Sequence, residues 1–254
     1  MTERKNDRPV CLITGAAGGI GKEIVRKYLE NGYQVVLIDL DGARLAETVA
    51  ELGFPAQQSD CWALDITREK DVEDMVRAVT GKYGHIDVLV NTAGICGRYD
   101  ITEDYGYDNF RRIYEVNVFG TFLMMEKVLP VMREQKKGVI TNFGSCSGMR
   151  GYSLEIGYGS SKWAVIGMSK NVAVEYGKYN VRCNSISPGW VATEMMKKTL
   201  EDYEREGKVN FVLSPMDRAA EPYEIADTVF YLSSDQASFI SGANICVDGG
   251  KTAC

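Results

Sequence analysis

The chain has 254 residues, of which 45% are hydrophobic and 25% are charged, and its formal net charge is −6. This composition is ordinary for a soluble globular protein, and the acidic balance argues against a broad nucleic-acid footprint, which needs clustered lysines and arginines. No apolar run approaches the length of a membrane span. The polar start, residues 1–8, lacks the apolar segment of a signal peptide, so we expect a cytoplasmic protein that binds neither nucleic acid nor membrane.

The first predicted elements are a short buried strand at residues 10–14, a glycine-rich turn and a helix at 19–31. Strand, turn and helix in this order form the context of a dinucleotide-binding fingerprint. Glycines let the backbone approach a pyrophosphate closely, and the start of the helix offers free N–H groups to the phosphates. The simpler interpretation is a plain turn that happens to be rich in glycine. The residues expected to contact the cofactor are Gly15, Ala17, Gly19, Ile20 and Gly21.

A second strand, at residues 34–39, ends in an acid at the expected place, because Asp39 follows Gly21 by eighteen residues. A carboxylate there can hydrogen-bond both hydroxyls of an adenosine ribose, and it would repel a 2′-phosphate. Leu40 and Asp41 come next, so this turn offers no cation to a 2′-phosphate. We therefore predict NAD rather than NADP as the cofactor, with Asp39 and Leu40 beside the ribose.

The rest of the chain continues to alternate strands with helices. Further strands are expected near residues 61–65, 87–91, 138–143, 181–187 and 244–247, and further helices near 42–52, 69–83, 107–134, 156–178, 191–205 and 222–233. This alternation predicts an α/β fold with a parallel doubly wound sheet, in one domain spanning residues 1–254, with a polar extension at 1–8 and a substrate-side lid at about 190–215. Ligands bind outside the carboxyl ends of such strands. The residues that follow predicted strand ends are Gly15, Asp39, Asp65, Asn91, Ser145 and Pro188.

Tyr158 and Lys162 form a candidate acid/base pair. They lie four residues apart on a predicted helix, where positions i and i+4 share a face. A free tyrosine has a pKa of about 10, and a fixed positive charge nearby favours the phenolate and lowers that pKa. Ser145 lies thirteen residues before Tyr158 and could hydrogen-bond a substrate oxygen, although it could also cap a turn, and Ser147 is a neighbouring competitor.

Other classes of function account for fewer residues. The lone histidine, His85, lies in a predicted turn and is expected at the surface, so it is a poor candidate for a Ser-His-Asp hydrolase. The seven cysteines show no C-x-x-C spacing and no histidine/cysteine cluster suggests zinc, so reduced thiols and metal-free catalysis are expected. A methyltransferase would leave Tyr158, Lys162 and Thr193 unexplained. An NAD(H)-sensing binding protein on the same fold stays open as the alternative function.

At this point the chain resembles the short-chain dehydrogenase/reductase family, of the classical type. The match runs from about residue 9 to residue 250, and several motifs occur in the family's order. The glycine-rich turn matches T-G-x-x-x-G-I-G. The N-N-A-G motif occurs with threonine in place of the second asparagine, and P-G-x-x-x-T occurs at 188–193. The matching residues are Asp65 with Ile66, Asn91-Thr92-Ala93-Gly94, Asn117, Ser145, Tyr158, Lys162 and Pro188-Gly189-Trp190-Val191-Ala192-Thr193.

The resemblance implies a seven-stranded sheet in the order 3-2-1-4-5-6-7 and hydride transfer between NAD(H) and a secondary alcohol or ketone. Asn117 would hold a water that links Lys162 to solvent, although it could instead only pin a helix kink. Thr193 would contact the nicotinamide amide, although it could also be a helix N-cap. The further cofactor contacts implied are Asp65, Ile66, Asn91, Ala93, Gly94, Tyr158, Lys162, Pro188, Gly189, Val191 and Thr193. Family members commonly form tetramers through the helices near 107–134 and 156–178, so we expect a homotetramer, with a dimer as the second choice.

The substrate pocket is expected between residues 95–99, 146–156 and 190–215. Its walls would include Cys96, Tyr99, Ser147, Tyr152, Trp190, Met195, Met196, Tyr203 and Phe211. These side chains suggest an apolar pocket for a ring or a medium-sized secondary alcohol, although some of them could instead pack a lid or a subunit contact. Arg98 and Arg150 are candidates to bind an anionic substrate, but arginines in surface loops are usually solvated.

Overall fold

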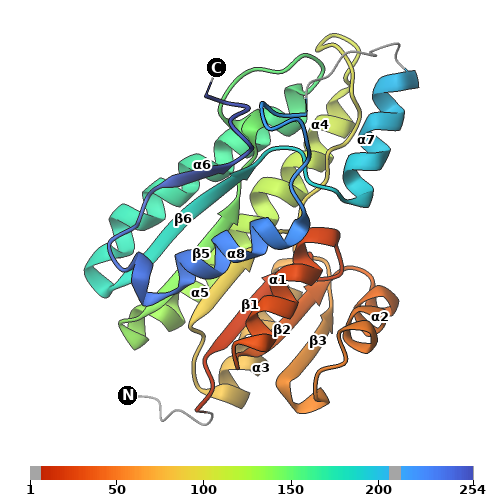
Figure 1. Cartoon of the computed structure of the whole chain (residues 1–254). Coiled ribbons are helices and arrows are strands. Elements are labelled where there is room, and N and C mark those ends of the chain that lie inside the picture. Colours follow the sequence, from red (N-terminus) through yellow and green to blue (C-terminus); the bar gives the residue numbers. More distant parts are fainter. Residues whose placement is uncertain (1–6, 206–212, 254) are drawn as a thin grey trace.

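A parallel sheet crosses the middle of the computed structural model, which describes residues 7–205 and 213–253 (Figure 1). Within these residues seven strands form one sheet, and every neighbouring pair is parallel. In spatial order the strands are β3 (Ser59–Ala63), β2 (Gln34–Asp39), β1 (Val10–Thr14), β4 (Val88–Asn91), β5 (Gly138–Phe143), β6 (Val181–Pro188) and β7 (Asn244–Val247). The expected fold class and the expected strand order 3-2-1-4-5-6-7 are confirmed.

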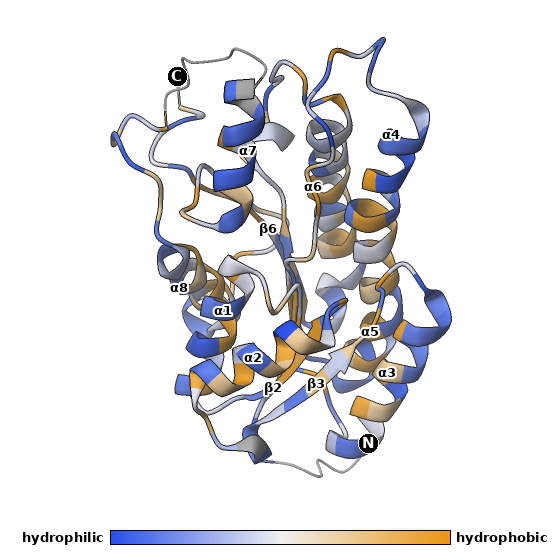
Figure 2. Cartoon of the chain, turned by 90° about the vertical axis from the view of Figure 1, so that its right-hand side faces the viewer, coloured by the Kyte–Doolittle hydropathy of each residue, from blue (hydrophilic) through white to orange (hydrophobic). Residues whose placement is uncertain are grey.

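Helices cover both faces of the sheet (Figure 2). One face carries α1 (Gly19–Glu30), α2 (Gly42–Leu52) and α8 (Pro222–Ser233). The other carries α3 (Glu69–Tyr83), α4 (Tyr107–Tyr114), α5 (Thr121–Gln135) and α6 (Ile156–Tyr176). The remaining helix, α7 (Glu194–Arg205), lies at the end of the sheet where the site is expected. Short 3-10 turns lie at Ala56–Gln58, Cys146–Gly148, Gly177–Tyr179 and Asp235–Ala237.

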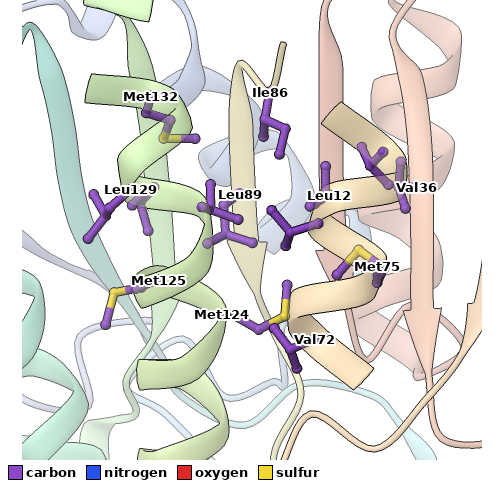
Figure 3. Close-up of a cluster of buried hydrophobic side chains, with 14 of the residues drawn as sticks. Leu12, Val36, Val72, Met75, Ile86, Leu89, Met124, Met125, Leu129 and Met132 are labelled. Carbon is purple, nitrogen blue, oxygen red and sulfur yellow. The ribbon is translucent and has the colours of Figure 1, made fainter. Parts of the chain in front are cut away.

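Alternate residues of β1 face the two helical layers, because side chains along a strand point to opposite faces. Leu12 belongs to the core cluster under α3 and α5, where it lies with Met75 and Met124 (Figure 3). Its neighbours Cys11 and Ile13 belong to the cluster under α1 and α8. All three residues are fully buried. A strand that is apolar on both faces fits a sheet covered on both sides, as the continuous apolar runs predicted.

Two expected helices differ from the structure. The single helix expected at 107–134 is interrupted by a π-helical segment, Glu115–Gly120, between α4 and α5. The helix expected from residue 191 begins at Glu194, because Val191 forms a β-bridge with Ala220 and the N–H of Ala192 donates to the oxygen of Ala220 at 2.9 Å. Among the residues described, none of the helices combines the length and the hydropathy that crossing a bilayer requires.

The expectation that His85 lies at the surface is wrong, because only 2% of the residue is exposed. Its Nδ1 lies 2.9 Å from the oxygen of Tyr83 and its Nε2 lies 3.1 Å from the oxygen of Arg8. The Nε2 also lies 3.3 Å from the carboxylate of Asp87, which accepts the N–H of Val10 at 2.9 Å. These contacts tie together the chain segments that enter β1 and β4, at the end of the sheet opposite the site.

Candidate functional site

The glycine-rich turn packs too closely for side chains at its key positions. Gly15 has φ +65°, and a Cβ there would lie 2.9 Å from the backbone nitrogen of Ala93. A Cβ on Gly21 would overlap the carbonyl oxygen of Gly15, and one on Gly19 would lie 2.8 Å from Cγ2 of Thr193. These close approaches bring the turn between β1 and α1 against the loops that follow β4 and β6. Three of the predicted cofactor loops therefore meet at the carboxyl end of the sheet.

Asp39 is fixed beside this turn by the turn's own backbone. Its Oδ2 accepts the N–H of Ala17 at 3.0 Å, and Leu40 after it is 66% exposed. The prediction that no cation lies here was incomplete, because Nη2 of Arg44 donates to the oxygen of Ala17 at 3.1 Å. The sequence signal was available: Arg44 lies in the first turn of α2, which Asp41 caps by accepting two N–H groups, and so it faces the same corner as Asp39.

The side chains of several predicted cofactor residues bond to or pack against neighbouring protein groups. The carboxylate of Asp65 accepts the N–H and the hydroxyl of Thr67 at 2.9 and 2.7 Å. Ile66 is buried in the core, so close to Gly120 that a Cβ there would lie 2.7 Å from Cδ1 of Ile66. Asn91 is buried in the sheet, and its Nδ2 donates to Oδ1 of Asn142 at 2.8 Å. The side chains of Ile66 and Asn91 therefore stabilise the fold.

Asn117 lies in the π-helical segment and joins it to two neighbouring elements. Its Oδ1 accepts the N–H of Ile95 at 2.8 Å, and its Nδ2 donates to the oxygen of Ile95 at 2.9 Å and to Oγ of Ser161 at 3.0 Å. A Cβ on Gly94 would lie 3.2 Å from Oδ1 of Asn117 and 3.4 Å from Nζ of Lys162. The π-helical segment thus places Asn117 beside Lys162, with Gly94 in between.

Ser145, Tyr158 and Lys162 come together where β5 ends and α6 begins. Ser145 starts the turn after β5 and its Oγ accepts the N–H of Ser147 at 3.1 Å. Lys162 is 5% exposed, its Nζ donates to the oxygen of Phe143 at 2.8 Å, and the same nitrogen lies 5.6 Å from the centre of the Tyr158 ring. The i and i+4 positions on α6 therefore share a face, as predicted.

Burial dominates the protonation of this pair. Burial raises the pKa of the Tyr158 phenol well above its usual range, the charge of Cys96 acts in the same direction, and a hydrogen bond with Ser145 lowers it. Burial lowers the pKa of Lys162 to about 8. The lowered tyrosine pKa that the sequence led us to expect is not found in this structure, because desolvation of the buried phenol disfavours the phenolate.

The loop after β6 contacts β7 and the residue that follows it at one end, and the glycine-rich turn at the other. The N–H of Gly189 donates to the oxygen of Val247 at 3.0 Å, and a Cβ on Gly189 would lie 2.9 Å from Cα of Asp248. Further along, Oγ1 of Thr193 accepts the N–H of Met196 at 3.3 Å. This bond is that of an N-cap for α7, so the structure supports the N-cap interpretation of Thr193, and the close approach to Gly19 keeps the same residue next to the glycine-rich turn. Pro188 ends β6, and Val191 is buried beside it.

The predicted substrate residues that the structure describes lie in the loops after β4, β5 and β6 and on α7. Burial raises the pKa of the Cys96 thiol, and a hydrogen bond from Tyr99 opposes this effect only in part. The hydroxyl of Tyr99 lies 3.0 Å from Oγ1 of Thr199 on α7, which ties that helix to the loop. Ser147 is buried, whereas Tyr152 and Trp190 are partly exposed. Phe211, within 206–212, and the side chain of Tyr203 lie outside the described part of the chain.

The two candidate arginines behave differently. The guanidinium of Arg98 pairs with Asp100 at 2.6 Å in an exposed loop. Arg150 instead donates to the backbone oxygen of Lys251 at 3.1 Å. Lys251 was missed by the sequence reasoning, and its Nζ lies 4.9 Å from the ring centre of Trp190. No sequence signal was available, because Lys251 follows the last strand and matches no motif.

Among residues 7–205 and 213–253, no group of three or more His, Cys, Asp or Glu side chains is arranged to hold a metal ion. The described site consists of a hydroxyl, a phenol, an ammonium and backbone amides. Such groups can donate hydrogen bonds to an oxygen and move a proton on and off it.

Known proteins resemble this chain over nearly its full length. The model of a family described as "Enoyl-(Acyl carrier protein) reductase" matches residues 15–252. Levodione reductase from Leifsonia aquatica is 35% identical over 259 aligned residues, covering 99% of this chain and 97% of the relative. Trans-4-hydroxycyclohexanecarboxylate dehydrogenase from Sinomonas cyclohexanicum is 37% identical, covering 96% of this chain and 93% of the relative.

Solved structures give the same result. The crystal structure of levodione reductase superposes with a TM-score of 0.92 at 34% identity, covering 97% of this chain and 98% of that one. NAD+-bound xylitol dehydrogenase has a TM-score of 0.88 at 32% identity and coverages of 95% and 98%. ElxO with NADP bound has a TM-score of 0.88 at 28% identity and coverages of 97% and 100%. The chain therefore belongs to the short-chain dehydrogenase/reductase family and is an oxidoreductase that acts on alcohols or ketones.

Proposed function

We propose that this protein transfers hydride between NAD(H) and a secondary alcohol or its ketone, with Ser145, Tyr158 and Lys162 as catalytic residues and Asn117 in support. The observation that carries the proposal is the convergence of this set on the end of the sheet that also holds the glycine-rich turn. Lys162 is anchored to Phe143 and lies over the Tyr158 ring, and Ser145 hydrogen-bonds the phenol. A protein that only sensed the cofactor would have no use for this arrangement.

The residues at the carboxyl end of the sheet fit a dinucleotide. The cradle formed by Gly15, Gly19 and Gly21 leaves no room for a Cβ, so the backbone can approach a pyrophosphate closely. The first turn of α1 presents free N–H groups to the phosphates, and its N-cap, Gly18, contributes no side-chain bond. When bound, NAD(H) would supply the hydride chemistry.

The side chains handle the proton on the substrate oxygen. Tyr158 accepts that proton during oxidation and returns it during reduction. Ser145, whose Oγ already hydrogen-bonds the phenol, donates to the same oxygen and stabilises the charge that develops there. Lys162 places a positive charge beside the phenol, and Asn117 fixes the backbone around Gly94 next to that charge. The raised pKa of Tyr158 in this structure keeps the phenol protonated at neutral pH, which is the form that can donate a proton in the reductive direction.

NAD is the cofactor that the corner around Asp39 favours. A carboxylate held by the N–H of Ala17 presents negative charge where a 2′-phosphate would lie. Arg44 stands at the other side of Ala17, and its charge reduces the penalty against NADP. We expect Asp39→Ser to raise the ratio of NADP to NAD turnover by at least about tenfold, as expected when a single like-charge repulsion of about 1.4 kcal/mol is removed. Combining Asp39→Ser with Arg44→Gln should reduce that gain.

The decisive experiment is an assay of NADH formation and consumption across secondary alcohols, polyols and hydroxy acids and their ketones, with wild type and Tyr158→Phe. General acid/base catalysis is worth roughly a hundred- to ten-thousandfold, so Tyr158→Phe should lose about that much turnover while calorimetry shows unchanged NAD binding. Turnover that survives in Tyr158→Phe would sink the mechanism. Tight NAD binding without turnover of any substrate would favour the NAD(H) sensor.

We also propose that the protein assembles as a homotetramer through α5 and α6, with a dimer as the second choice. Phe119, Phe122 and Trp163 are 54%, 48% and 53% exposed, and rings of this size are commonly covered at subunit interfaces. Met124, Met125 and Ile166, which lie on the same two helices, are instead buried in the subunit. Light scattering at micromolar concentration tests the assembly, and a monomeric mass would refute it. A single domain and a cytoplasmic location stay predictions.

A further inference from the structure

The C-terminal turn carries a lysine into the substrate side of the site. After β7, the carboxylate of Asp248 accepts the N–H of Gly250 at 3.0 Å and the N–H and hydroxyl of Thr252 at 2.9 and 2.6 Å. Gly249 and Gly250 have φ of +61° and +85°, which an L side chain rarely adopts. Three hydrogen bonds and two glycines therefore fix the backbone of this turn, and with it the position of Lys251.

The same turn is packed against the loops that line the substrate side. A Cβ on Gly249 would lie 2.8 Å from Oγ of Ser214, and one on Gly250 would lie 3.5 Å from Cγ of Pro215. On its other side, Cα of Asp248 lies within 2.9 Å of the position of a Cβ on Gly189, in the P-G motif. The turn therefore packs between residues 214–215, at the end of the predicted lid, and the loop after β6. Figure 1 shows this region where the C-terminal end of the chain lies.

Lys251 lies over two aromatic rings of the predicted substrate pocket. Its Nζ is 4.9 Å from the ring centre of Trp190 and 5.8 Å from that of Tyr152. Arg150 brings a second cation to these rings. It donates to the backbone oxygen of Lys251, and the guanidinium carbon of Arg150 lies 5.5 Å from the centre of the Tyr152 ring. Two positive charges therefore share one aromatic platform, and burial lowers the pKa of Lys251.

This platform is close to the reacting centre. The charges of Cys146 and Glu155 affect the pKa of Lys251, and the same two side chains affect the pKa of Tyr158. Cys146 directly follows Ser145 and hydrogen-bonds both Ser145 and Tyr152. A molecule with its oxygen on Ser145 and Tyr158 therefore has to extend only across Cys146 and Tyr152 to meet the ammonium.

The charges around the platform favour an anion. The carboxylate oxygens of Asp248 are turned to their own loop, as the bonds to Gly250 and Thr252 show. The negative charges of Glu155 and Asp248 both act on Lys251, and so does the positive charge of Arg150. Lys251 and Arg150 together place two positive charges beside apolar rings, where an anion is poorly screened by water and is attracted more strongly.

We propose that Lys251, assisted by Arg150, binds an anionic group of the substrate, so that the substrate is a hydroxy acid or its oxo acid. The proposal rests on the alcohol/ketone function proposed above. The hydroxyl or ketone lies at Ser145 and Tyr158, the hydrocarbon part lies on Tyr152 and Trp190, and a carboxylate accepts hydrogen bonds from the ammonium. Arg98, the other arginine considered, takes no part, because it is paired with Asp100 in an exposed loop.

The test compares matched ligands by calorimetry. Oxo carboxylates on a cyclohexane ring and on short chains are each paired with their amides, which have nearly the same shape without the charge. Each ligand is titrated into the full-length enzyme, with and without NAD+. A charge-assisted hydrogen bond of roughly 1.5 kcal/mol corresponds to about tenfold in affinity, so at least one carboxylate should bind about tenfold more tightly than its amide.

The variant Lys251→Met keeps the length of the side chain and removes its charge. We expect it to bring the ratio of carboxylate to amide affinity close to one. Lys178→Met is the matched control, because Lys178 also lies over a tyrosine ring, 5.1 Å from the centre of Tyr179, but on the exposed turn after α6. It should leave the ratio unchanged.

Three results would overturn the proposal: equal affinities in wild type, no binding of any carboxylate at millimolar concentration, or a preference that survives Lys251→Met. These outcomes are distinct from failure of the proposed function. That failure would be seen as absent NAD binding in the same titrations or as turnover that persists in Tyr158→Phe.

Discussion

The two ends of the sheet both bury titratable side chains, but they use them differently. At the amino end, His85 bonds to the backbone of Arg8 and Tyr83, and Asp87 bonds to the backbone of Val10. These bonds connect the chain segments that lead into β1 and β4. At the carboxyl end, Lys162 and Ser145 converge on the phenol of Tyr158, which can exchange a proton with a substrate. Burial of a charged group therefore does not mark a site by itself. What distinguishes the site is convergence on an atom that can react.

Activity should be more sensitive to small changes in shape at the carboxyl end than at the amino end, and among such changes Gly21→Ala has the largest effect we expect. A Cβ there overlaps the oxygen of Gly15, so the glycine-rich turn has to move. A misplacement of about 1 Å can cost roughly a hundredfold in rate, and we expect at least that loss in kcat/KM together with weakened NAD binding. Steady-state kinetics and calorimetry measure both quantities.

Gly81→Ala is the matched control for that change. Gly81 also lies in a helix, α3, but a Cβ there has nothing within 4 Å. Alanine is the better helix former by about 1 kcal/mol, so Gly81→Ala should keep full activity and unfold at a slightly higher temperature. If both variants behave alike, the contrast between a packed turn and an ordinary helix is wrong.

Lys162 offers a test of the carboxyl end through pH. Its pKa is about 8 in the folded chain and about 10.4 in an unfolded one. Between these values the unfolded chain binds more protons, so the unfolding free energy of wild type rises with pH. The gain should be about 3 kcal/mol between pH of roughly 8 and 10.5, since one pKa unit corresponds to 1.36 kcal/mol. Urea unfolding at a series of pH values measures this gain.

The variant Lys162→Met isolates this contribution, because it removes the proton-binding group and keeps a side chain of similar length. The difference in stability between wild type and Lys162→Met should shift in favour of wild type as pH rises through that range. It should be flat below about pH 7, where both folded and unfolded lysines are charged. A difference that does not change with pH would show that burial does not perturb Lys162. Activity should fall in the variant at every pH.

At the amino end of the sheet, we expect a substitution to lower stability more than it lowers activity. His85→Leu removes the groups that bond the oxygens of Tyr83 and Arg8. Leaving a buried polar group unsatisfied costs roughly 1–3 kcal/mol, so thermal unfolding should occur at a clearly lower temperature. At a temperature where the variant is folded, kcat/KM should stay within about twofold of wild type. A large loss of activity at full stability would contradict the division between the two ends.

The sequence predicted the framework of the site because that framework depends on local chemistry. Gly15 and Gly21 are read from one turn, and Tyr158 and Lys162 from one helical spacing, so no knowledge of distant contacts is needed. The fold class followed from apolar runs such as the one around Leu12, while the strand order came from the family resemblance. His85 was placed at the surface because its neighbours along the chain suggested a turn, whereas its burial depends on Arg8 in another segment.

The substrate side could not be predicted in the same way. Lys251, Trp190 and Tyr152 come from three separate segments and meet only because the turn after β7 folds back over the loop after β6. A helix kink at Asn117 entered the sequence analysis only as an alternative role of that residue, because the hydrogen bonds that hold Asn117 there go to Ile95, twenty-two residues away. Such contacts leave no periodic signal in the sequence.

Arg98→Gln should have the smallest effect of the substitutions considered. It tests which of two positions at the carboxyl end, Arg98 or Lys251, binds the anion. The ion pair with Asp100 is exposed, and such pairs contribute about 0–1 kcal/mol and are weakened by salt. The unfolding free energy should therefore change by less than about 1 kcal/mol, and the kinetics for carboxylates and amides should stay as in wild type. Selective loss of carboxylate turnover in Arg98→Gln would move the anion site to the loop after β4. An unchanged preference leaves the turn after β7 as its location, because Arg98 is then a solvated surface charge.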